Sequence, residues 1–293
     1  MTKKLVFIHG RSQQGKDSLA LKKEWIASFR EGLAKQGLQL PIDEAAIRFP
    51  YYGDTLDQLV AGADPADAAR VVIRGDLSPT ERDYIRALLE EIRKKAGITD
   101  AEIDAEIAAE VVERGPLNWP WVQAILKVID RKVPFGSSAS VALFTKDVFD
   151  YLTKGGIRDI IETGVIQAIQ PNEPTVIVAH SLGTIVAYNI LRREGKNLQW
   201  NIPLLVTVGS PLGVEKIRRS IAPTTYPECV NAWFNAFDKR DVVALYPLQD
   251  PHFMVGKVII NNSDVKNHTE NRHGIAGYLD DPVVAKTIYD ALL

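Results

Sequence analysis

Short apolar runs alternate along this chain with longer stretches whose apolar positions follow the helical period. The runs are rich in β-branched residues and are bounded by glycine, proline or polar residues, which is typical of strands buried on both faces. The alternation predicts an α/β fold with a mainly parallel sheet of about six strands flanked by helices. We expect these strands at residues 4–9, 45–49, 176–179, 203–208, 231–237 and 257–262.

The helical stretches carry recognisable start signals. Asp17 or Ser18 begins a helix that runs to about residue 36, and residues 78–81 form a capping box with proline at the first helical position. The helix that follows this box should end near residue 95. Two further helices are expected to end near residues 114 and 131. Four more are expected at residues 138–152, 157–169, 182–195 and 282–293.

The stretch from about residue 55 to residue 134 is charged, helical and without strand signals. A helical block inserted between sheet strands predicts a cap or lid. We therefore divide the chain into a core of residues 1–54 and 135–293 and a cap of residues 55–134. Trp119 and Trp121 in the cap either pack against its helices or form an apolar wall for a substrate.

Composition narrows the function classes. The formal net charge is −2 over 293 residues with both signs interspersed, so nothing favours nucleic acid as a partner. The first apolar run stops at His9-Gly10, too early for a signal peptide, and no run reaches the length for stable membrane insertion. The single cysteine, Cys229, argues against an internal disulfide or a cysteine-based metal site. We expect a cytoplasmic protein.

The run at residues 176–186 shows the clearest chemistry. An apolar strand ends at His180-Ser181, passes Gly183 and becomes an amphipathic helix. Such a sharp strand-to-helix turn exposes the residue at the bend, and its consensus is G-x-S-x-G. The chain reads Ala179-x-Ser181-x-Gly183, with small residues where the strand and helix backbones nearly touch. Ser181 is therefore a candidate nucleophile.

A serine is a good nucleophile only when a neighbouring base takes its proton, and histidine suits this role because its pKa lies near neutral pH. The loop after the last expected strand holds two histidines, His268 and His273. We favour His273, because it directly precedes the final helical segment, and keep His268 as the alternative base. The remaining histidines are expected in supporting or surface positions: His9, His180 and His252.

The acid that orients the base should follow the preceding strand. Asp238 and Asp241 both do, and we favour Asp241 because the apolar pair after it would anchor the loop, whereas Asp238 is the alternative acid. An oxyanion hole needs two backbone N–H groups. We expect them from Leu182 and Arg11, with Gly10 permitting the close turn beside Arg11.

The loop after the first expected strand, which contains Gly10 and Arg11, also carries a competing motif. Residues 10–16 read G-x-x-x-x-G-K between a strand and a helix, which is the context of a nucleotide-binding P-loop. Magnesium coordination requires Ser or Thr directly after Lys16, but Asp17 stands there and Ser18 follows one place late. No metal site is expected either, since the histidines and carboxylates show no HExxH-type spacing. The nucleotide-binding reading is therefore the weakest alternative.

With these motifs in the order Ser, Asp, His, the chain resembles the α/β-hydrolase superfamily, on its lipase and esterase side. The resemblance covers residues 1–54 and 135–293, implies an α/β-hydrolase fold with a helical cap insertion, and does not extend to the cap. The antiparallel strands that usually precede the His-Gly strand are absent from the pattern, which leaves a minimal parallel core. The residues that carry the resemblance are 7–10, 179–183, 209–213, 235–241 and 273.

The resemblance implies a serine hydrolase that cleaves carboxylic esters of small molecules or lipids through Ser181, His273 and Asp241, without a cofactor. An alternative from another class is a non-catalytic protein that keeps the fold for binding, with the cap as its partner surface. The intact order of candidate residues favours the enzyme.

Overall fold

The computed structural model describes residues 3–10, 17–51, 72–74, 77–109, 119–132 and 138–293. Within these ranges six strands form a single sheet in which every neighbouring pair is parallel, in the order β2-β1-β3-β4-β5-β6. The prediction of an α/β fold with a parallel sheet of about six strands is confirmed. The strands are β1 (Lys4–Ile8), β2 (Ile47–Arg48), β3 (Thr175–His180), β4 (Ile202–Val208), β5 (Val230–Ala236) and β6 (Ile260–Asn262).

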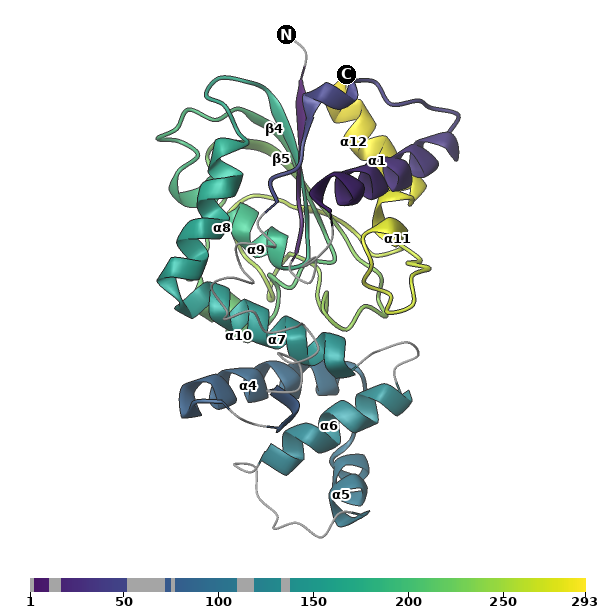
Figure 1. Ribbon diagram of the computed structural model, residues 1–293, viewed down its shortest axis with the longest axis vertical. Coiled ribbons are helices and arrows are strands. Elements are labelled where there is room, and N and C mark those ends of the chain that lie inside the picture. Colours follow the sequence, from purple (N-terminus) through teal and green to yellow (C-terminus); the bar gives the residue numbers. More distant parts are fainter. Residues whose placement is uncertain (1–2, 11–16, 52–71, 75–76, 110–118, 133–137) are drawn as a thin grey trace.

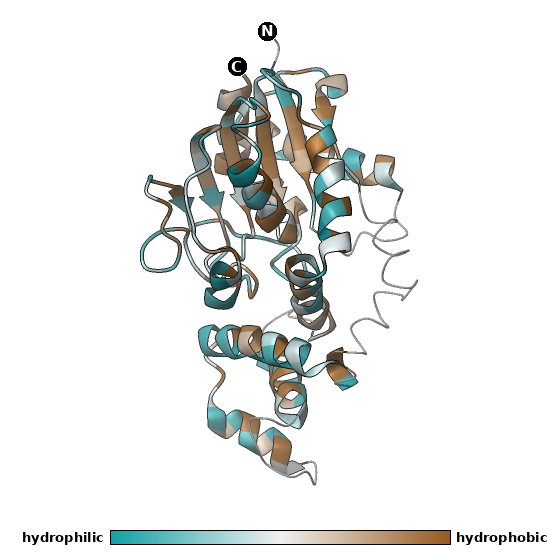
Figure 2. Cartoon of the chain, turned by 90° about the vertical axis from the view of Figure 1, so that its left-hand side faces the viewer, coloured by the Kyte–Doolittle hydropathy of each residue, from teal (hydrophilic) through white to brown (hydrophobic). Residues whose placement is uncertain are grey.

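Both faces of the sheet are covered by apolar packing. Successive side chains of a strand point to opposite faces, so each strand contributes to both. In β1, Leu5 and Phe7 join one apolar cluster while Val6 and Ile8 join the other. Figure 1 shows helices on either side of the sheet, and Figure 2 shows its central strands as mostly apolar. On one side lie α1 (Ser18–Ala34), α11 (Ala276–Leu279) and α12 (Pro282–Leu292), and on the other lie α8 (Gly155–Gln167) and α9 (Leu182–Arg193).

Four helices extend from the sheet domain at the end away from the chain termini (Figure 1). These four helices, which lie between β2 and β3 in the chain and are called the insertion helices below, are α4 (Pro79–Lys95), α5 (Asp100–Ala109), α6 (Trp119–Lys132) and α7 (Ser138–Thr153). The expected capping box begins α4, where the Ser78 Oγ accepts from the Glu81 N–H and the Glu81 carboxylate accepts from the Ser78 N–H at 3.0 Å. The division into a core and a cap at residues 55 and 134 stays a prediction.

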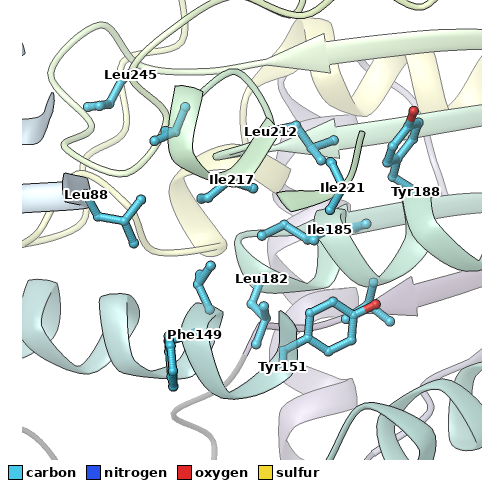
Figure 3. Close-up of a cluster of buried hydrophobic side chains, with 14 of the residues drawn as sticks. Leu88, Phe149, Tyr151, Leu182, Ile185, Tyr188, Leu212, Ile217, Ile221 and Leu245 are labelled. Carbon is cyan, nitrogen blue, oxygen red and sulfur yellow. The ribbon is translucent and has the colours of Figure 1, made fainter. Parts of the chain in front are cut away.

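These helices share their apolar packing with the sheet domain. Leu88 of α4 and Phe149 of α7 belong to the same buried cluster as Leu182 and Leu212, which follow β3 and β4 (Figure 3). An ion pair of 3.3 Å also joins Lys146 of α7 to Glu81 of α4. The four helices therefore pack on the sheet domain through apolar surface.

Trp119 and Trp121 take part in packing. The Trp119 Nε1–H donates to the Val72 carbonyl at 2.6 Å, and the Arg93 guanidinium lies over the Trp121 ring at 5.8 Å. Both rings are partly buried against the apolar cluster. Among the described residues that line the cavity beside Ser181, neither tryptophan appears. The packing interpretation fits these contacts.

Two short helices were not expected from the sequence, α10 (Glu215–Ser220) and α11. Strands β2 and β6 are shorter than expected, because a 3₁₀ turn at Glu44–Ala46 precedes β2 and residues 257–259 are not in a strand. The expected end of α5 at residue 114 lies outside the described residues. Among the described helices, none combines the length and apolar character needed to span a membrane.

Candidate active site

The strand–turn–helix expected around Ser181 is present. Strand β3 ends at His180, α9 begins at Leu182, and Ser181 between them has φ 55° and ψ −128°. A non-glycine residue with positive φ has a strained backbone. In a strand-to-helix turn of this kind, that backbone conformation directs the side chain away from the sheet. The geometry follows from the close approach of α9 to β1: a Cβ on Gly183 would lie 2.6 Å from the His9 carbonyl oxygen.

Three side chains meet at this bend. The Ser181 Oγ lies 2.8 Å from the His273 Nε2, and the His273 Nδ1 lies 2.7 Å from the Asp241 Oδ2. Each side chain stands beyond the carboxyl end of a strand: Ser181 after β3, Asp241 in the loop after β5 and His273 in the loop after β6. Because these ends meet at one edge of a parallel sheet, distant parts of the chain converge there.

The Asp241 carboxylate is held from several sides. Its Oδ1 accepts from the Val243 N–H at 2.8 Å and from the Ala244 N–H at 3.3 Å. Its Oδ2 accepts from the Tyr278 hydroxyl at 2.6 Å in addition to the His273 ring. Burial and the charge of Asp241 raise the pKa of Tyr278 well above its ordinary value, so this hydroxyl stays protonated and remains a donor. The carboxylate therefore has one orientation, facing His273.

His180 supports the His273 loop. Its Nε2 lies 2.7 Å from the His273 carbonyl oxygen, and since a carbonyl only accepts, the proton is on Nε2. The two rings lie 4.7 Å apart between centroids. Loss of hydration and then the neighbouring His273 lower the pKa of His180 to about 3, so the ring is neutral at neutral pH. It fixes the backbone that carries His273.

His9 is buried next to the bend. Its ring stacks on Phe49 with 5.3 Å between centroids, and its Nδ1 bonds the Gly10 carbonyl. Burial lowers the pKa of His9 to about 4. Gly10 faces the turn directly, because a Cβ there would lie 3.0 Å from the Ser181 Cβ. His9 and Gly10 therefore pack directly against the turn that carries Ser181.

The alternative acid lies in a different set of contacts. Asp238 is buried, pairs with the Arg240 guanidinium at 3.2 Å, and accepts from the Asn267 N–H at 2.9 Å. These bonds join the loop after β5 to the loop after β6. Asp238 therefore braces the two loops that carry Asp241 and His273.

The alternative base lies on the surface. The His268 Nε2 is 3.1 Å from the Asp280 Oδ2, and the side chain is 60% exposed. His252, expected at the surface, stacks on the Tyr246 ring at 4.0 Å between centroids. Of the histidines in the described part of the chain, the one whose ring is hydrogen-bonded to Ser181 is His273.

The expected oxyanion donors are only partly described. Leu182 is the first residue of α9, and the first N–H groups of a helix have no acceptor within the helix. Arg11 lies outside the described residues, as does the competing motif at residues 10–16 beyond its first glycine. Among the described residues, no group of three or more histidine, cysteine, aspartate or glutamate side chains could hold a metal ion.

A cavity of about 410 Å³ opens beside the three side chains. Ser181 and His273 face it, and most of its remaining wall is apolar, with Glu24 and Asp147 as its carboxylates. The apolar wall comes from α1, α7, the start of α9 and the loops after β5 and β6. It includes Leu21, Trp25, Val141, Leu143, Phe144 and Ile275.

Two supporting residues gave no signal in the sequence. Tyr278 sits in an apolar segment, and its contact with Asp241 depends on how α11 packs. Asn267 is fully buried; its Nδ2 donates to the Gly274 carbonyl at 2.8 Å, and its Oδ1 accepts from the Thr269 N–H at 3.0 Å. Asparagine is common in loops for local reasons, so its role at this site was not recognisable.

Comparisons of the chain with protein-family models, with curated proteins and with solved structures found no significant match. What the site can do therefore has to follow from its own geometry.

Proposed function

We propose that the protein is a serine hydrolase of the α/β-hydrolase superfamily that cleaves carboxylic esters through an acyl-enzyme. The observation that carries the proposal is the unbroken hydrogen-bonded series from Ser181 through His273 to Asp241. A nucleophile, a base in contact with it and an acid that orients the base are the parts that acyl transfer requires. The cavity beside Ser181 gives a substrate access to this series.

In the proposed reaction His273 accepts the Ser181 proton through Nε2 as the Ser181 Oγ attacks the ester carbonyl carbon. The ester C–O bond then breaks, and His273 returns the proton to the leaving alcohol. Water, deprotonated by the same histidine, releases the carboxylic acid from Ser181. Asp241 keeps the imidazole in the tautomer with its proton on Nδ1 and stabilises the imidazolium that forms.

Charge develops on the carbonyl oxygen during attack, and backbone N–H groups stabilise it best when they are already in position. Leu182 supplies one such group at the start of α9, where the helix dipole adds to the effect. The second donor is expected from Arg11. Losing one donor of this kind costs about 3 kcal/mol in the barrier.

Membership of the α/β-hydrolase superfamily is supported by the strained serine between β3 and α9, by Gly183 against β1 and by the parallel sheet. The described sheet would be a reduced form of that fold. The order Ser181, Asp241, His273 along the chain agrees with the superfamily pattern. The reaction needs no cofactor, and a cytoplasmic location fits it.

The substrate proposed is an ester with an apolar acyl chain. The largely apolar wall of the cavity would bury methylene groups, each worth about 0.8 kcal/mol or about fourfold in kcat/KM. A panel of p-nitrophenyl esters should therefore show kcat/KM rising with acyl length until the cavity is filled. The acyl length at the maximum measures the usable depth of the cavity.

A fluorophosphonate probe tests the nucleophile. We expect labelling of the wild type and of Ser210→Ala, and none of Ser181→Ala. Ser210 is a matched control because it is buried at the end of the neighbouring strand and bonds the Thr184 hydroxyl. Labelling that persists in Ser181→Ala overturns the proposal, whereas no adduct and no ester turnover in the wild type would favour a binding protein.

A further inference from the structure

A second cavity, of about 250 Å³, lies between the insertion helices and the loop after β5. Five of its ten described lining residues are basic and four are apolar, and the only carboxylate among them is Asp241, which is already bonded to His273 and Tyr278. The basic side chains come from α4, from α6, from the loop after β5 and from the loop after β6. They are Lys95, Lys132, Lys239, Arg240 and Arg272.

Three of the five cations have a carboxylate partner. Lys132 pairs with Glu102 at 2.8 Å, and Arg240 pairs with Asp238 at 3.2 Å. Lys239 lies 3.5 Å from Asp264, with both groups largely exposed to water. An exposed pair of this kind contributes little and leaves the lysine available to another anion.

Two of the cations, Lys95 and Arg272, form no ion pair with any carboxylate in the described ranges. Lys95 is the last residue of α4, and its ammonium group lies 5.1 Å from the centre of the Tyr246 ring, which helps to hold the side chain in place. Arg272 donates from Nη1 to the Asn267 carbonyl at 3.0 Å, which uses one of the five donors of its guanidinium. Both side chains are therefore positioned at the cavity while retaining donors for a ligand.

We propose that this basic cavity binds a phosphate or carboxylate group, with Lys95 and Arg272 as its main donors. An anion there would meet a charge-assisted hydrogen bond from each side, one from α4 and one from the loop after β6. Lys239 and Arg240 add positive potential. A cationic ligand would be repelled by these side chains.

The basic cavity adjoins the cavity at Ser181. Val242 lines both, and in the loop after β6 Asn271 and His273 face the first cavity while Arg272 faces the second. An anionic group bound at Arg272 can therefore be part of an ester whose reacting carbonyl lies at Ser181. This assignment of the anion to the substrate rests on the proposed hydrolase function. A free anion bound beside the site has the same chemistry at Arg272.

Inorganic phosphate tests the site without turnover. Its dissociation constant is measured by ³¹P NMR titration at constant ionic strength for the wild type, Lys95→Gln and Arg272→Gln. Each variant should weaken binding by about tenfold, the effect of one lost charge-assisted hydrogen bond. Ser181→Ala and Lys266→Gln are the controls and should bind as the wild type does. Lys266 is an exposed lysine that does not line this cavity.

Phosphate affinities that are equal in Lys95→Gln, Arg272→Gln and Lys266→Gln would overturn the proposal, whether or not the protein hydrolyses esters. The source of the anion is then decided with two matched esters, p-nitrophenyl hydrogen adipate and p-nitrophenyl methyl adipate. A kcat/KM preference for the acid that falls in Lys95→Gln shows that the substrate carries the anion. Phosphate binding without such a preference shows a free anion.

Discussion

Asp238 and Asp241 follow the same strand, yet their carboxylates have different surroundings. Asp241 accepts from His273 and Tyr278, whereas Asp238 pairs with Arg240 and accepts from a backbone N–H. The difference arises because the chain turns between them, with the Asp241 N–H bonded to the Asp238 carbonyl. At the residue scale, Asp241 faces the His273 ring, which we propose it orients, and Asp238 joins the loops after β5 and β6.

Paired substitutions separate these roles. Asp241→Asn should lower kcat by about 10³- to 10⁴-fold, because an amide facing Nδ1 favours the wrong histidine tautomer. Asp238→Asn should retain most of kcat but lower the free energy of unfolding by about 1–3 kcal/mol, since a buried charged acceptor is lost. Steady-state kinetics and urea unfolding measure both. A larger kcat loss in Asp238→Asn would assign the orienting role to Asp238.

Histidine burial sets a pH dependence of stability. The pKa of His9 is lowered by burial from 6.5 to about 4, so between these values the unfolded chain binds a proton that the folded protein does not. The contribution of neutral His9 is therefore fully present above pH 6.5 and is lost as the pH falls toward 4, at about 1.4 kcal/mol per pH unit. His180, with its pKa lowered to about 3, acts in the same direction.

Urea unfolding at pH 7 and pH 5 measures this dependence. We expect the free energy of unfolding to be smaller at pH 5 in the wild type, and the difference to shrink in His9→Gln. Because the comparison is between two differences, a general destabilisation by the substitution cancels. An unchanged difference in His9→Gln would mean that His9 is protonated in the folded protein at pH 5.

At the scale of elements, the turn between β3 and α9 depends on backbones that nearly touch. In Gly183→Ala the new Cβ would overlap the Ile8 carbonyl oxygen of β1 and lie 2.6 Å from the His9 carbonyl oxygen, and the backbone of a central strand cannot move aside cheaply. We expect a loss of about 3 kcal/mol in the free energy of unfolding, together with reduced ester turnover.

Gly164→Ala is the matched control for this substitution. Gly164 lies inside α8, and a Cβ added there would meet nothing within 4 Å. It should stabilise the protein by about 0.5–1 kcal/mol, because alanine loses less backbone entropy in a helix. Thermal unfolding of both variants checks the pair. A Gly183→Ala protein as stable and active as Gly164→Ala would contradict the close approach of α9 to β1.

The sequence predicted the elements whose signals are local. The strand at Thr175–His180 and the bend at Ser181 followed from an apolar run and a glycine, and the start of α4 followed from the capping box at Ser78. Helix α11 and the Tyr278 contact were missed because they depend on packing between segments far apart in the chain. For the same reason, the sequence favoured Asp241 but kept Asp238 as the alternative, because each carboxylate has partners in distant segments.

Across the whole molecule, the insertion helices and the sheet domain share one buried apolar cluster. Leu88 of α4 packs in the same cluster as Phe149 of α7 and Leu182 of α9 (Figure 3). Elements that share a core lose their stability together. We therefore expect a single calorimetric unfolding transition in which the insertion helices and the sheet melt at the same temperature.

Leu88→Ala should lower the stability of the whole protein by about 2–5 kcal/mol, the cost of a buried leucine side chain. Leu19→Ala, at a position 55% exposed on α1, is the control and should change little. Calorimetry and circular dichroism follow the transition. An insertion that melts at a lower temperature while the sheet remains folded would show two independent units.

We propose that Ser181 carries the acyl group during ester cleavage. Rapid acid quenching after mixing with p-nitrophenyl hexanoate, followed by mass spectrometry of the digested protein, measures this directly. The claim predicts a hexanoyl adduct on the peptide that contains Ser181, formed with a burst of p-nitrophenol, and absent in Ser181→Ala. Steady hydrolysis with an unmodified Ser181 peptide, or turnover retained in Ser181→Ala, would contradict it.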